Sequence, residues 1–380
     1  MRPRSVRPAL PSPSLEEADR LARSVLRHRL HLHPKENVTI ETYPSSLGWA
    51  TGFVREARRL GARPVVLYED ERSYWAAVEE GRAALVGTPG APEWAALEAS
   101  DVYVYFWGPE DLARRRALPE AVAERLVSFN RRWYELAGKA GLRGARMGIA
   151  RVTEANARFY GVPWRRWRDE VLAASVRAPA TLRRAAARVA RRLERGREVR
   201  IRHPNGTDLS LALCGRDANV AVGEVTEASR RTPFGMLASV PDATVYVAVD
   251  ESTADGTFVS NRPATSAFDR TVTGGTLRFR DGRLVGRSFA RGGAAFDGPY
   301  RAAGAGRDRP SFLEVGLDPA LRTAPLLEEA EAGAVTVGVG RNAPFGGATR
   351  VDFLAYLTVG GADLTIDGRP LVRRGRVVDG

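Results

Sequence analysis

The sequence contains very few residues that could form disulfides or bind transition metals. Cys214 is the single cysteine among 380 residues, so no disulfide can form within the chain, and we predict a reducing, cytoplasmic location. No run of 18 apolar residues occurs, which predicts the absence of a transmembrane helix. The basic N-terminus, MRPRSVRPALPSPS, lacks an apolar segment, so we predict a flexible tail over residues 1–14 rather than a signal peptide.

Lysine is almost absent as well. Lys35 and Lys139 are the only lysines, although the chain holds 58 basic residues and has a formal net charge of +13. The codon usage of a GC-rich genome explains such an arginine excess, and we favour this interpretation. The alternative is an acidic partner, because a basic surface attracts carboxylates and phosphates. The sequence shows no helix-turn-helix, RNP or zinc-finger pattern, so we do not expect nucleic acid binding.

The four histidines and the cysteine do not suggest a catalytic centre. His28, His31 and His33 gather at the end of the first predicted helix, where cations balance the helix dipole. Their spacing differs from the i, i+4 spacing of helical zinc ligands, so we predict no metal there. His203 precedes a turn, and we interpret it as structural. Nothing near Cys214 would activate its thiol, which predicts a buried, inert side chain.

Apolar runs alternate with helical periodicity in the first half of the chain. A capping box, Ser-Leu-Glu-Glu at residues 14–17, starts an amphipathic helix that we expect to extend to about His33. The alternation predicts a mostly parallel α/β domain over residues 15–195. Its further helices are predicted over Leu47–Leu60, Arg72–Glu80 and Leu118–Ala137, and its strands over Asn37–Thr42, Pro64–Tyr68, Val102–Trp107 and Arg146–Ala150.

An arginine-rich helix closes this half, with the sequence TLRRAAARVARRLERG at residues 181–196. Its apolar residues occur at helical spacing and should face the core; they are Leu182, Ala186, Val189 and Leu193. The arginines point away from that stripe. A charge run of this kind is usually a solvated face, and the alternative is a groove for an acidic ligand. The candidate ligand-binding residues are Arg183, Arg184, Arg191 and Arg192.

Short alternating runs, glycines and threonines replace the helical pattern after Gly196. Hairpin turns at Asn205-Gly206 and Asp281-Gly282 separate several of these runs. They predict a β-rich, largely antiparallel domain over residues 196–380. One run, TVYVAV at residues 244–249, is β-branched and aromatic, so it should form a strand that presents Thr244 at its start. The chain has no G-x-S-x-G, P-loop or C-x-x-C motif.

Six segments of the second half together resemble the aminopeptidase T-like metallopeptidases, and the dihydroxypyridine dioxygenases share this fold. The resemblance runs from about residue 36 to the end and rests on motif order and spacing after residue 197. The segments are VRIRHPNGTDLSLAL (199–213), SVPDATVYVAVDESTADGTF (239–258), FLEVGLDP (312–319), GAVTVGVGRN (333–342), ATRVDFLAYL (348–357) and LTIDGRPLV (364–372).

The resemblance implies a metal site whose ligands in the family are two Glu, two His and one Asp, with a Tyr nearby. The first Glu falls on Thr244 and the second is retained as Glu314. The first His falls on Thr336, and the Tyr falls near Ala343 or Phe345. The His-x-Asp pair falls on Asp352 and Leu354. No histidine follows His203, so both His ligands are missing in any register.

These replacements predict a non-catalytic relative of the family. A catalytic zinc or iron needs about three protein ligands, so we predict no bound metal and no cofactor. We predict a homodimeric pseudoenzyme that binds a peptide or partner protein, for example a precursor peptide in a bacterial natural-product pathway. The alternative is an active hydrolase or dioxygenase-like enzyme whose carboxylates alone hold a hard cation. Its ligands would be drawn from Glu314, Asp352, Asp318 and Glu224.

Overall fold

The computed structural model describes residues 13–231, 235–265, 271–322 and 325–378. The chain forms two compact units, which we term the N-unit (Met1–Phe159 and Val225–Val240) and the C-unit (Tyr160–Glu224 and Pro241–Gly380). Residues 160–195 thus belong to the same compact unit as the β-rich part of the chain. The predicted domain boundary at residue 195 concerns which segments fold independently, and it stays a prediction. Most of the predicted tail lies outside the described residues.

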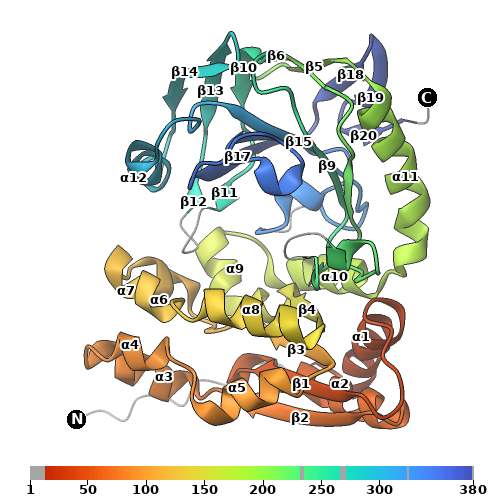
Figure 1. The fold of residues 1–380 in the computed structure, drawn as a ribbon, viewed down its shortest axis with the longest axis vertical. Helices are drawn as coiled ribbons and strands as arrows, with labels where there is room; N and C mark the ends of the chain where they lie inside the picture. Colours follow the sequence, from red (N-terminus) through yellow and green to blue (C-terminus); the bar gives the residue numbers. More distant parts are fainter. Residues whose placement is uncertain (1–12, 232–234, 266–270, 323–324, 379–380) are drawn as a thin grey trace. The chain divides into compact units, whose positions relative to one another are not determined.

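The N-unit is built on a five-stranded sheet in which every pair of neighbouring strands is parallel (Figure 1). The strand order is β2-β1-β3-β4-β8. Helices connect the strands, as the alternation in the sequence predicted. The last strand, β8, returns from a distant part of the chain. The strands are β1 (Asn37–Thr42), β2 (Arg63–Tyr68), β3 (Val102–Phe106), β4 (Arg143–Met147) and β8 (Leu237–Val240).

The first helix begins as predicted and ends earlier than predicted. In the capping box the Ser14 hydroxyl accepts from the Glu17 amide, and the Glu17 carboxylate accepts from the Ser14 amide. The predicted extension to His33 is wrong, because α1 ends at His28. His31 takes a positive φ of 50°, and this turn lets Leu30 bury its side chain completely.

The other helices of the N-unit are short. The predicted helix over Leu118–Ala137 is wrong as a single element, because the chain breaks between α7 and α8. The strand predicted at Arg146–Ala150 is displaced and ends at Met147. The helices are α1 (Leu15–His28), α2 (Leu47–Arg59), α3 (Glu71–Glu79), α4 (Ala83–Val86), α5 (Ala91–Glu98), α6 (Leu112–Arg116), α7 (Glu120–Leu126) and α8 (Asn130–Ala140); α9 (Glu154–Tyr160) follows.

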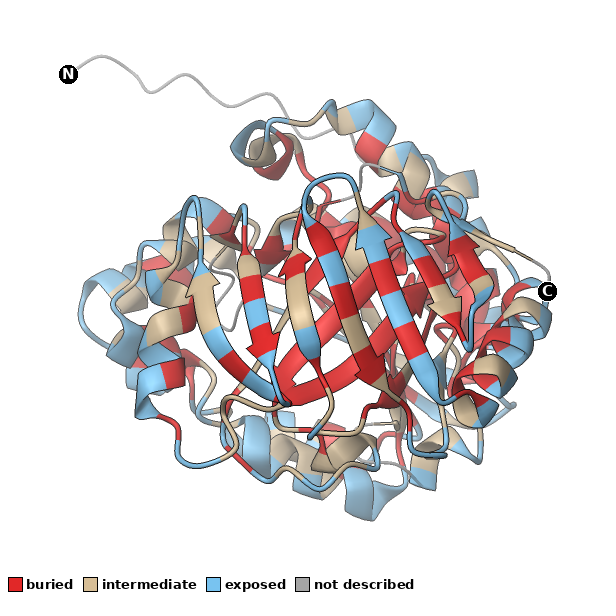
Figure 2. Cartoon of the chain, turned by 90° about the horizontal axis from the view of Figure 1, so that it is seen from above, coloured by how far each residue is buried: buried red, intermediate tan, exposed pale blue. Residues whose placement is uncertain are grey.

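The C-unit contains two larger antiparallel sheets, so the predicted fold class is confirmed. The first has eight strands in the order β14-β13-β10-β6-β5-β18-β19-β20, and buried and exposed residues alternate along them (Figure 2). These strands are β5 (Glu198–His203), β6 (Thr207–Ala212), β10 (Asp255–Val259), β13 (Thr276–Arg280), β14 (Arg283–Ser288), β18 (Asp363–Ile366), β19 (Arg369–Arg373) and β20 (Arg376–Val377).

The second sheet has five strands in the order β17-β16-β15-β9-β7. The predicted strand at residues 244–249 is confirmed as β9. The strands are β7 (Asn219–Ala221), β9 (Thr244–Ala248), β15 (Pro310–Gly316), β16 (Val335–Gly340) and β17 (Leu354–Val359). A two-stranded sheet and three helices complete the unit, namely β11 (Ala264–Thr265), β12 (Thr271–Val272), α10 (Trp164–Val176), α11 (Pro179–Arg195) and α12 (Ala294–Ala302).

One hydrophobic core joins the two large sheets and α11. The predicted apolar stripe of this helix is confirmed, since Leu182, Ala186, Val189 and Leu193 are all buried in that core. The prediction of a buried Cys214 is wrong, because this residue follows β6 in a loop and is exposed. In the described part of the chain, no helix is both long and apolar enough to cross a membrane.

Candidate binding site on the five-stranded sheet

The two faces of the five-stranded sheet have different chemistry. Side chains alternate along a strand, and directly paired residues of neighbouring strands share a face. Val245, Leu313 and Val337 lie on the face that enters the hydrophobic core. The opposite face, which we term the site face, carries Thr244, Tyr246, Phe312, Glu314, Thr336, Tyr356 and Thr358.

The strand register brings most of the predicted metal-ligand positions onto the site face. Glu314 pairs with Thr336 on one side and with Tyr246 on the other, and Thr244 pairs with Gly316 next to it. Leu354 is on the same face, at its far end opposite Gly340. The sequence alignment therefore identified one contiguous surface, although it could not show which side chains meet there.

Asp352 does not join this surface. It precedes β17, its side chain is fully exposed, and its carboxylate lies 3.8 Å from the Arg341 guanidinium. The carboxylate that falls where the family has a histidine is therefore a surface group.

Hydroxyl groups occupy two of the places where the resemblance implies ligands. The Thr336 hydroxyl lies 2.8 Å from the Thr358 hydroxyl, and both side chains are buried, so each satisfies the other. The Thr244 hydroxyl donates towards Asp242 Oδ1 at 3.4 Å and also hydrogen-bonds with the Glu314 side chain. Neither arrangement leaves a nitrogen or carboxylate donor where the family has one.

Several carboxyl groups gather around Glu314. Gly316 permits this, since an added Cβ there would lie 2.4 Å from the Glu329 carbonyl oxygen and 2.2 Å from that of Glu331. The short helix Glu328–Ala330 therefore rests against β15. The charge of Glu329, burial, and then the charges of Glu314, Glu328 and Asp242 raise the pKa of Tyr356 well above its usual range.

Burial and mutual repulsion disfavour ionisation of these carboxyl groups. Burial first, and then the charges of Glu329 and Asp242, raise the pKa of Glu314 well above its usual range. Burial raises the pKa of Glu329 to about 7. Burial, followed by the charge of Glu329, raises the pKa of Glu328 to about 8. Among the described residues, no basic side chain acts on the pKa of Glu314 or Glu329.

Aromatic side chains border the carboxyl groups. Tyr246, Phe312 and Phe345 are mutually in contact, with ring centroids 5.5–6.2 Å apart, and Phe312 also lies 6.1 Å from Tyr356. Gly338 leaves room for the Phe312 ring, because an added Cβ would approach it to 2.5 Å. We use the name acid–aromatic site for Asp242, Glu314, Glu328, Glu329, Tyr246, Phe312, Phe345 and Tyr356.

The sequence contained signals for part of this site. Tyr246 is two residues after Thr244 in a predicted strand, so alternation would have placed both on one face. Phe345 is one of the two positions on which the resemblance places the family's tyrosine. Nothing local marked Glu328 or Glu329, because only the packing of their helix on Gly316 brings them to the sheet.

The structure separates the predicted arginines into two groups. Arg191 and Arg192 line a hollow beside α11, together with Arg188 and Arg195, which helical spacing could have predicted. Arg183 instead lies 3.6 Å from the buried Glu224, and Arg184 is exposed elsewhere on the helix.

Comparisons with known proteins show the class of fold. No family model matches the chain, and no curated protein matches its sequence significantly. Its fold is similar to the folds of two solved structures.

The particular structures are low in sequence identity. The chain is similar to wild-type AmpT from Thermus thermophilus, with a TM-score of 0.73 and 18% identity over 96% of this chain and 99% of that one. It is also similar to 2,5-dihydroxypyridine dioxygenase from Pseudomonas putida, with a TM-score of 0.58 and 16% identity over 97% and 99% of the two chains. The predicted resemblance is confirmed for the fold, and such identities say nothing of activity.

The residues on the site face do not fit the metal that the resemblance implies. Transition metals at catalytic centres are held by about three imidazole, thiolate or carboxylate ligands. Here two ligand positions are threonines whose hydroxyls are engaged with other side chains, and a third is Leu354. In the part of the chain that the structure describes, no three His, Cys, Asp or Glu residues are grouped so that they could hold a metal ion.

Proposed function

We propose that this chain is a non-catalytic protein with an aminopeptidase-like fold that binds a peptide. The observation that carries the proposal is the composition of the site face, where a hydroxyl pair and a threonine stand beside a single buried Glu314. The half-buried rings of Tyr246, Phe345 and Tyr356 would contact a ligand, while the donors needed for metal-assisted hydrolysis are replaced. A binding function uses the aromatic rings and does not need metal-binding donors.

The charges of the acid–aromatic site favour a cationic group on the ligand. Among the described residues, no basic side chain acts on Glu314 or Glu329, and a bound ammonium would supply a neutralising charge. Aromatic faces also attract cations. A free peptide amino terminus carries such a group next to apolar side chains. We therefore propose that the amino terminus of the peptide binds at this site.

The partner we propose is a precursor peptide that is held for other enzymes of a bacterial natural-product pathway. The proposal extends to a homodimer in a cytoplasmic setting. β17 lies at the edge of the five-stranded sheet, whereas β16 lies inside it, so β17 is the strand that a second copy would cover. Light scattering at micromolar concentration should give twice the chain mass, and a monomer mass would contradict the dimer.

A mixed library of hexapeptide amides tests binding against catalysis. The library is supplied with free or acetylated amino termini, with or without added Zn²⁺, Co²⁺ or Fe²⁺, and bound and free peptides are identified by mass spectrometry. We expect retention of free-amine peptides, at least tenfold less retention of acetylated ones, and no shortened products. Glu314→Gln should weaken retention about tenfold, while the control Glu198→Gln on exposed β5 should not. Metal-dependent shortening of the peptides would overturn the proposal.

The alternative, a hydrolase or dioxygenase-like enzyme with a carboxylate-only metal site, has less support. Three of its four candidate carboxylates lie in separate ion pairs, and Glu314 is in none of these three pairs. Asp318 is 3.6 Å from Arg177, Glu224 is 3.6 Å from Arg183, and Asp352 is 3.8 Å from Arg341. A hard cation needs several oxygen ligands around one point. The added metal ions in the library experiment, extended to Mg²⁺ and Mn²⁺, also test this alternative.

A further inference from the structure

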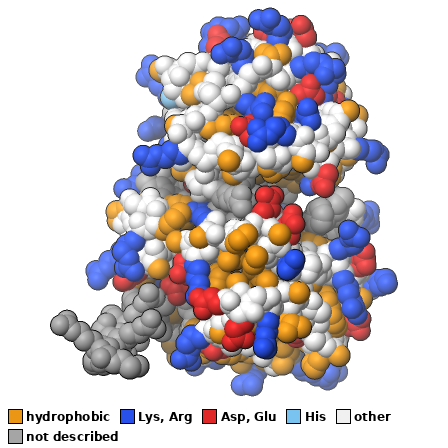
Figure 3. Space-filling model, turned by 90° about the vertical axis from the view of Figure 1, so that its left-hand side faces the viewer, with side chains coloured by type: hydrophobic (Ala, Val, Ile, Leu, Met, Phe, Trp, Pro, Cys, Tyr) orange, Lys and Arg blue, Asp and Glu red, His pale blue; other side chains and the backbone are white. Residues whose placement is uncertain are grey.

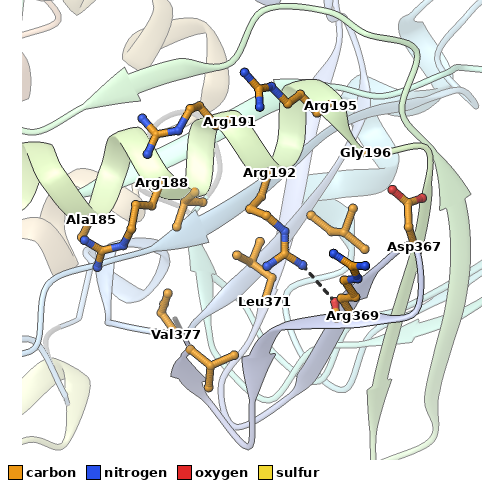
Figure 4. Close-up of a pocket in the computed structure, with 13 residues that line it drawn as sticks. Ala185, Arg188, Arg191, Arg192, Arg195, Gly196, Asp367, Arg369, Leu371 and Val377 are labelled. Atoms are coloured by element: carbon orange, nitrogen blue, oxygen red, sulfur yellow. Dashed lines mark hydrogen bonds between the residues drawn. The ribbon is translucent and has the colours of Figure 1, made fainter. Parts of the chain in front are cut away.

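A hollow of about 500 Å³ lies beside α11 in the C-unit, between that helix and the strands β18 to β20. Five arginines line it, namely Arg188, Arg191, Arg192 and Arg195 from the helix and Arg369 from β19. Figure 4 shows Arg192 reaching from the helix towards Arg369, whose carbonyl oxygen accepts a hydrogen bond from the Arg192 guanidinium at 3.2 Å. We term this feature the arginine hollow.

Most of the charge in the arginine hollow is not neutralised by the chain itself. Within the described residues, Arg191, Arg195 and Arg369 have no carboxylate partner. The single acidic lining residue is Asp367, whose carboxylate accepts hydrogen bonds from the Arg197 and Glu198 amides at 3.1 and 2.8 Å. Those two bonds lower the pKa of Asp367, so it stays ionised at the start of β5.

The wall of the arginine hollow beneath these charges is apolar. The buried core side chains Val189, Ile366 and Leu371 form its floor, and the half-buried Val377 and Val378 present apolar surface beside them. Guanidinium groups above an apolar surface match a ligand that carries carboxylates and aliphatic groups in alternation. A small inorganic anion would use the charges and leave the apolar wall without a partner.

This gathering of arginines differs from the surface elsewhere. On the face seen in Figure 3, basic side chains are scattered and mixed with acidic ones. Many other arginines are paired, for example Arg262 with Glu331 and Arg216 with Glu251. Unpaired like charges that lie close together repel one another, and an anionic partner relieves that repulsion. Codon usage explains the number of arginines and does not explain this local arrangement.

We propose that the arginine hollow binds an acidic peptide segment in which carboxylate side chains alternate with aliphatic ones. The inference deepens the proposed function, because it assigns a second part of the peptide to a second surface of the same unit. Carboxylates would accept paired hydrogen bonds from Arg191, Arg195 and Arg369, and the aliphatic side chains would cover Val377 and Val378.

The test uses a fluorescent octapeptide of alternating Glu and Leu that is blocked at both ends, so that it has no amino terminus for the acid–aromatic site. Its affinity is measured by anisotropy for the full chain at 50 and 300 mM NaCl. The hollow variant is Arg191→Gln/Arg195→Gln/Arg369→Gln. The control variant, Arg280→Gln/Arg301→Gln/Arg350→Gln, removes the same charge from exposed positions of the C-unit that do not line the hollow.

We expect the hollow variant to lose at least tenfold in affinity and the control variant less than twofold. The matching Gln/Leu peptide should bind at least tenfold more weakly, and affinity should fall at high salt because screening shortens the reach of charge. Equal losses in the two variants, or no loss in the hollow variant, would overturn the proposal. So would a short DNA duplex that binds as tightly as the peptide.

The test of the arginine hollow and the test of the proposed function can fail independently of each other. Glu314→Gln removes the carboxylate of the acid–aromatic site and should leave binding of the blocked Glu/Leu peptide unchanged. If the library experiment shows no binding while the blocked peptide binds as described, the amino-terminal site is wrong and the arginine hollow stands. The reverse result would retain the acid–aromatic site and reject the hollow.

Discussion

The acid–aromatic site and the arginine hollow belong to the same unit. One is acidic and the other basic, and only the charge of the first depends on pH. The first is built on the interior of a sheet, where burial raises the pKa values of its carboxyl groups and makes their charge conditional on pH. The second is built on exposed arginines, whose charge does not change in the accessible pH range. Packing should therefore control the first site, and ionic strength should control the second.

Substitution of Gly316 should have the largest effect on stability, because this glycine lets the helix carrying Glu329 pack on the sheet. An added Cβ would clash with backbone carbonyl groups that cannot rotate away. We expect Gly316→Ala to lower the free energy of unfolding by about 3 kcal/mol and to weaken peptide binding at the acid–aromatic site. Urea denaturation measures the first effect. Gly304→Ala is the control, since nothing lies within 4 Å of a Cβ there, and it should change stability by less than about 0.5 kcal/mol.

The pH dependence of stability should be the next largest effect. The pKa of Glu329 is about 7 in the folded chain and about 4.5 when exposed, so the folded state holds more protons between these values. The contribution of Glu329 to the free energy of unfolding should therefore fall by roughly 2–3 kcal/mol as the pH rises from 4.5 to above 7. Glu329→Gln should remove that part of the difference between pH 5 and pH 8 in urea denaturation. An unchanged difference would show that Glu329 is not buried in this way.

A smaller effect is expected for the hydroxyl pair on the site face. Thr336→Val leaves the buried Thr358 hydroxyl without its partner, which should cost about 1–2 kcal/mol. The double variant Thr336→Val/Thr358→Val removes both polar groups and should be closer to the original protein in stability than either single variant. A double-mutant cycle with additive losses would contradict the assignment of these hydroxyls to each other.

The smallest effect on stability should come from the arginine hollow. Arg191, Arg195 and Arg369 are exposed and have no partner among the described residues, so the hollow variant should unfold within about 0.5 kcal/mol of the original chain. Its thermal and urea transitions should match those of the control variant. A loss of several kcal/mol would show that these arginines serve the fold, and it would remove the contrast between the two sites.

The order of elements could largely be predicted from the sequence, because each signal was local. The capping box at residues 14–17, the β-branched run of β9 and the apolar stripe of α11 each report a periodicity or a cap that acts within a few residues. The errors arose where distant packing intervened. The first helix ends early because its following leucines turn into the core, and the predicted helix over residues 118–137 breaks into α7 and α8.

For the candidate site, the comparison of motifs selected positions on neighbouring strands. It placed Thr244, Glu314 and Thr336 at positions that prove to be neighbours on one face. It also included Asp352, which points into solvent beside Arg341. A motif position specifies the backbone location along a strand, whereas Asp352 lies two residues before β17, outside the alternation of that strand.

By itself, the sequence determined the two kinds of architecture, the absence of histidine after His203 and the surplus of arginine, because these are properties of residue type and spacing. Only the tertiary structure decided that Glu328 and Glu329 join Glu314 and that Arg369 joins the arginines of α11. Both groupings unite residues from separate segments through packing. Charge at a site depends on which side chains meet and on how much water they lose, and neither quantity is written in the order of residues along the chain.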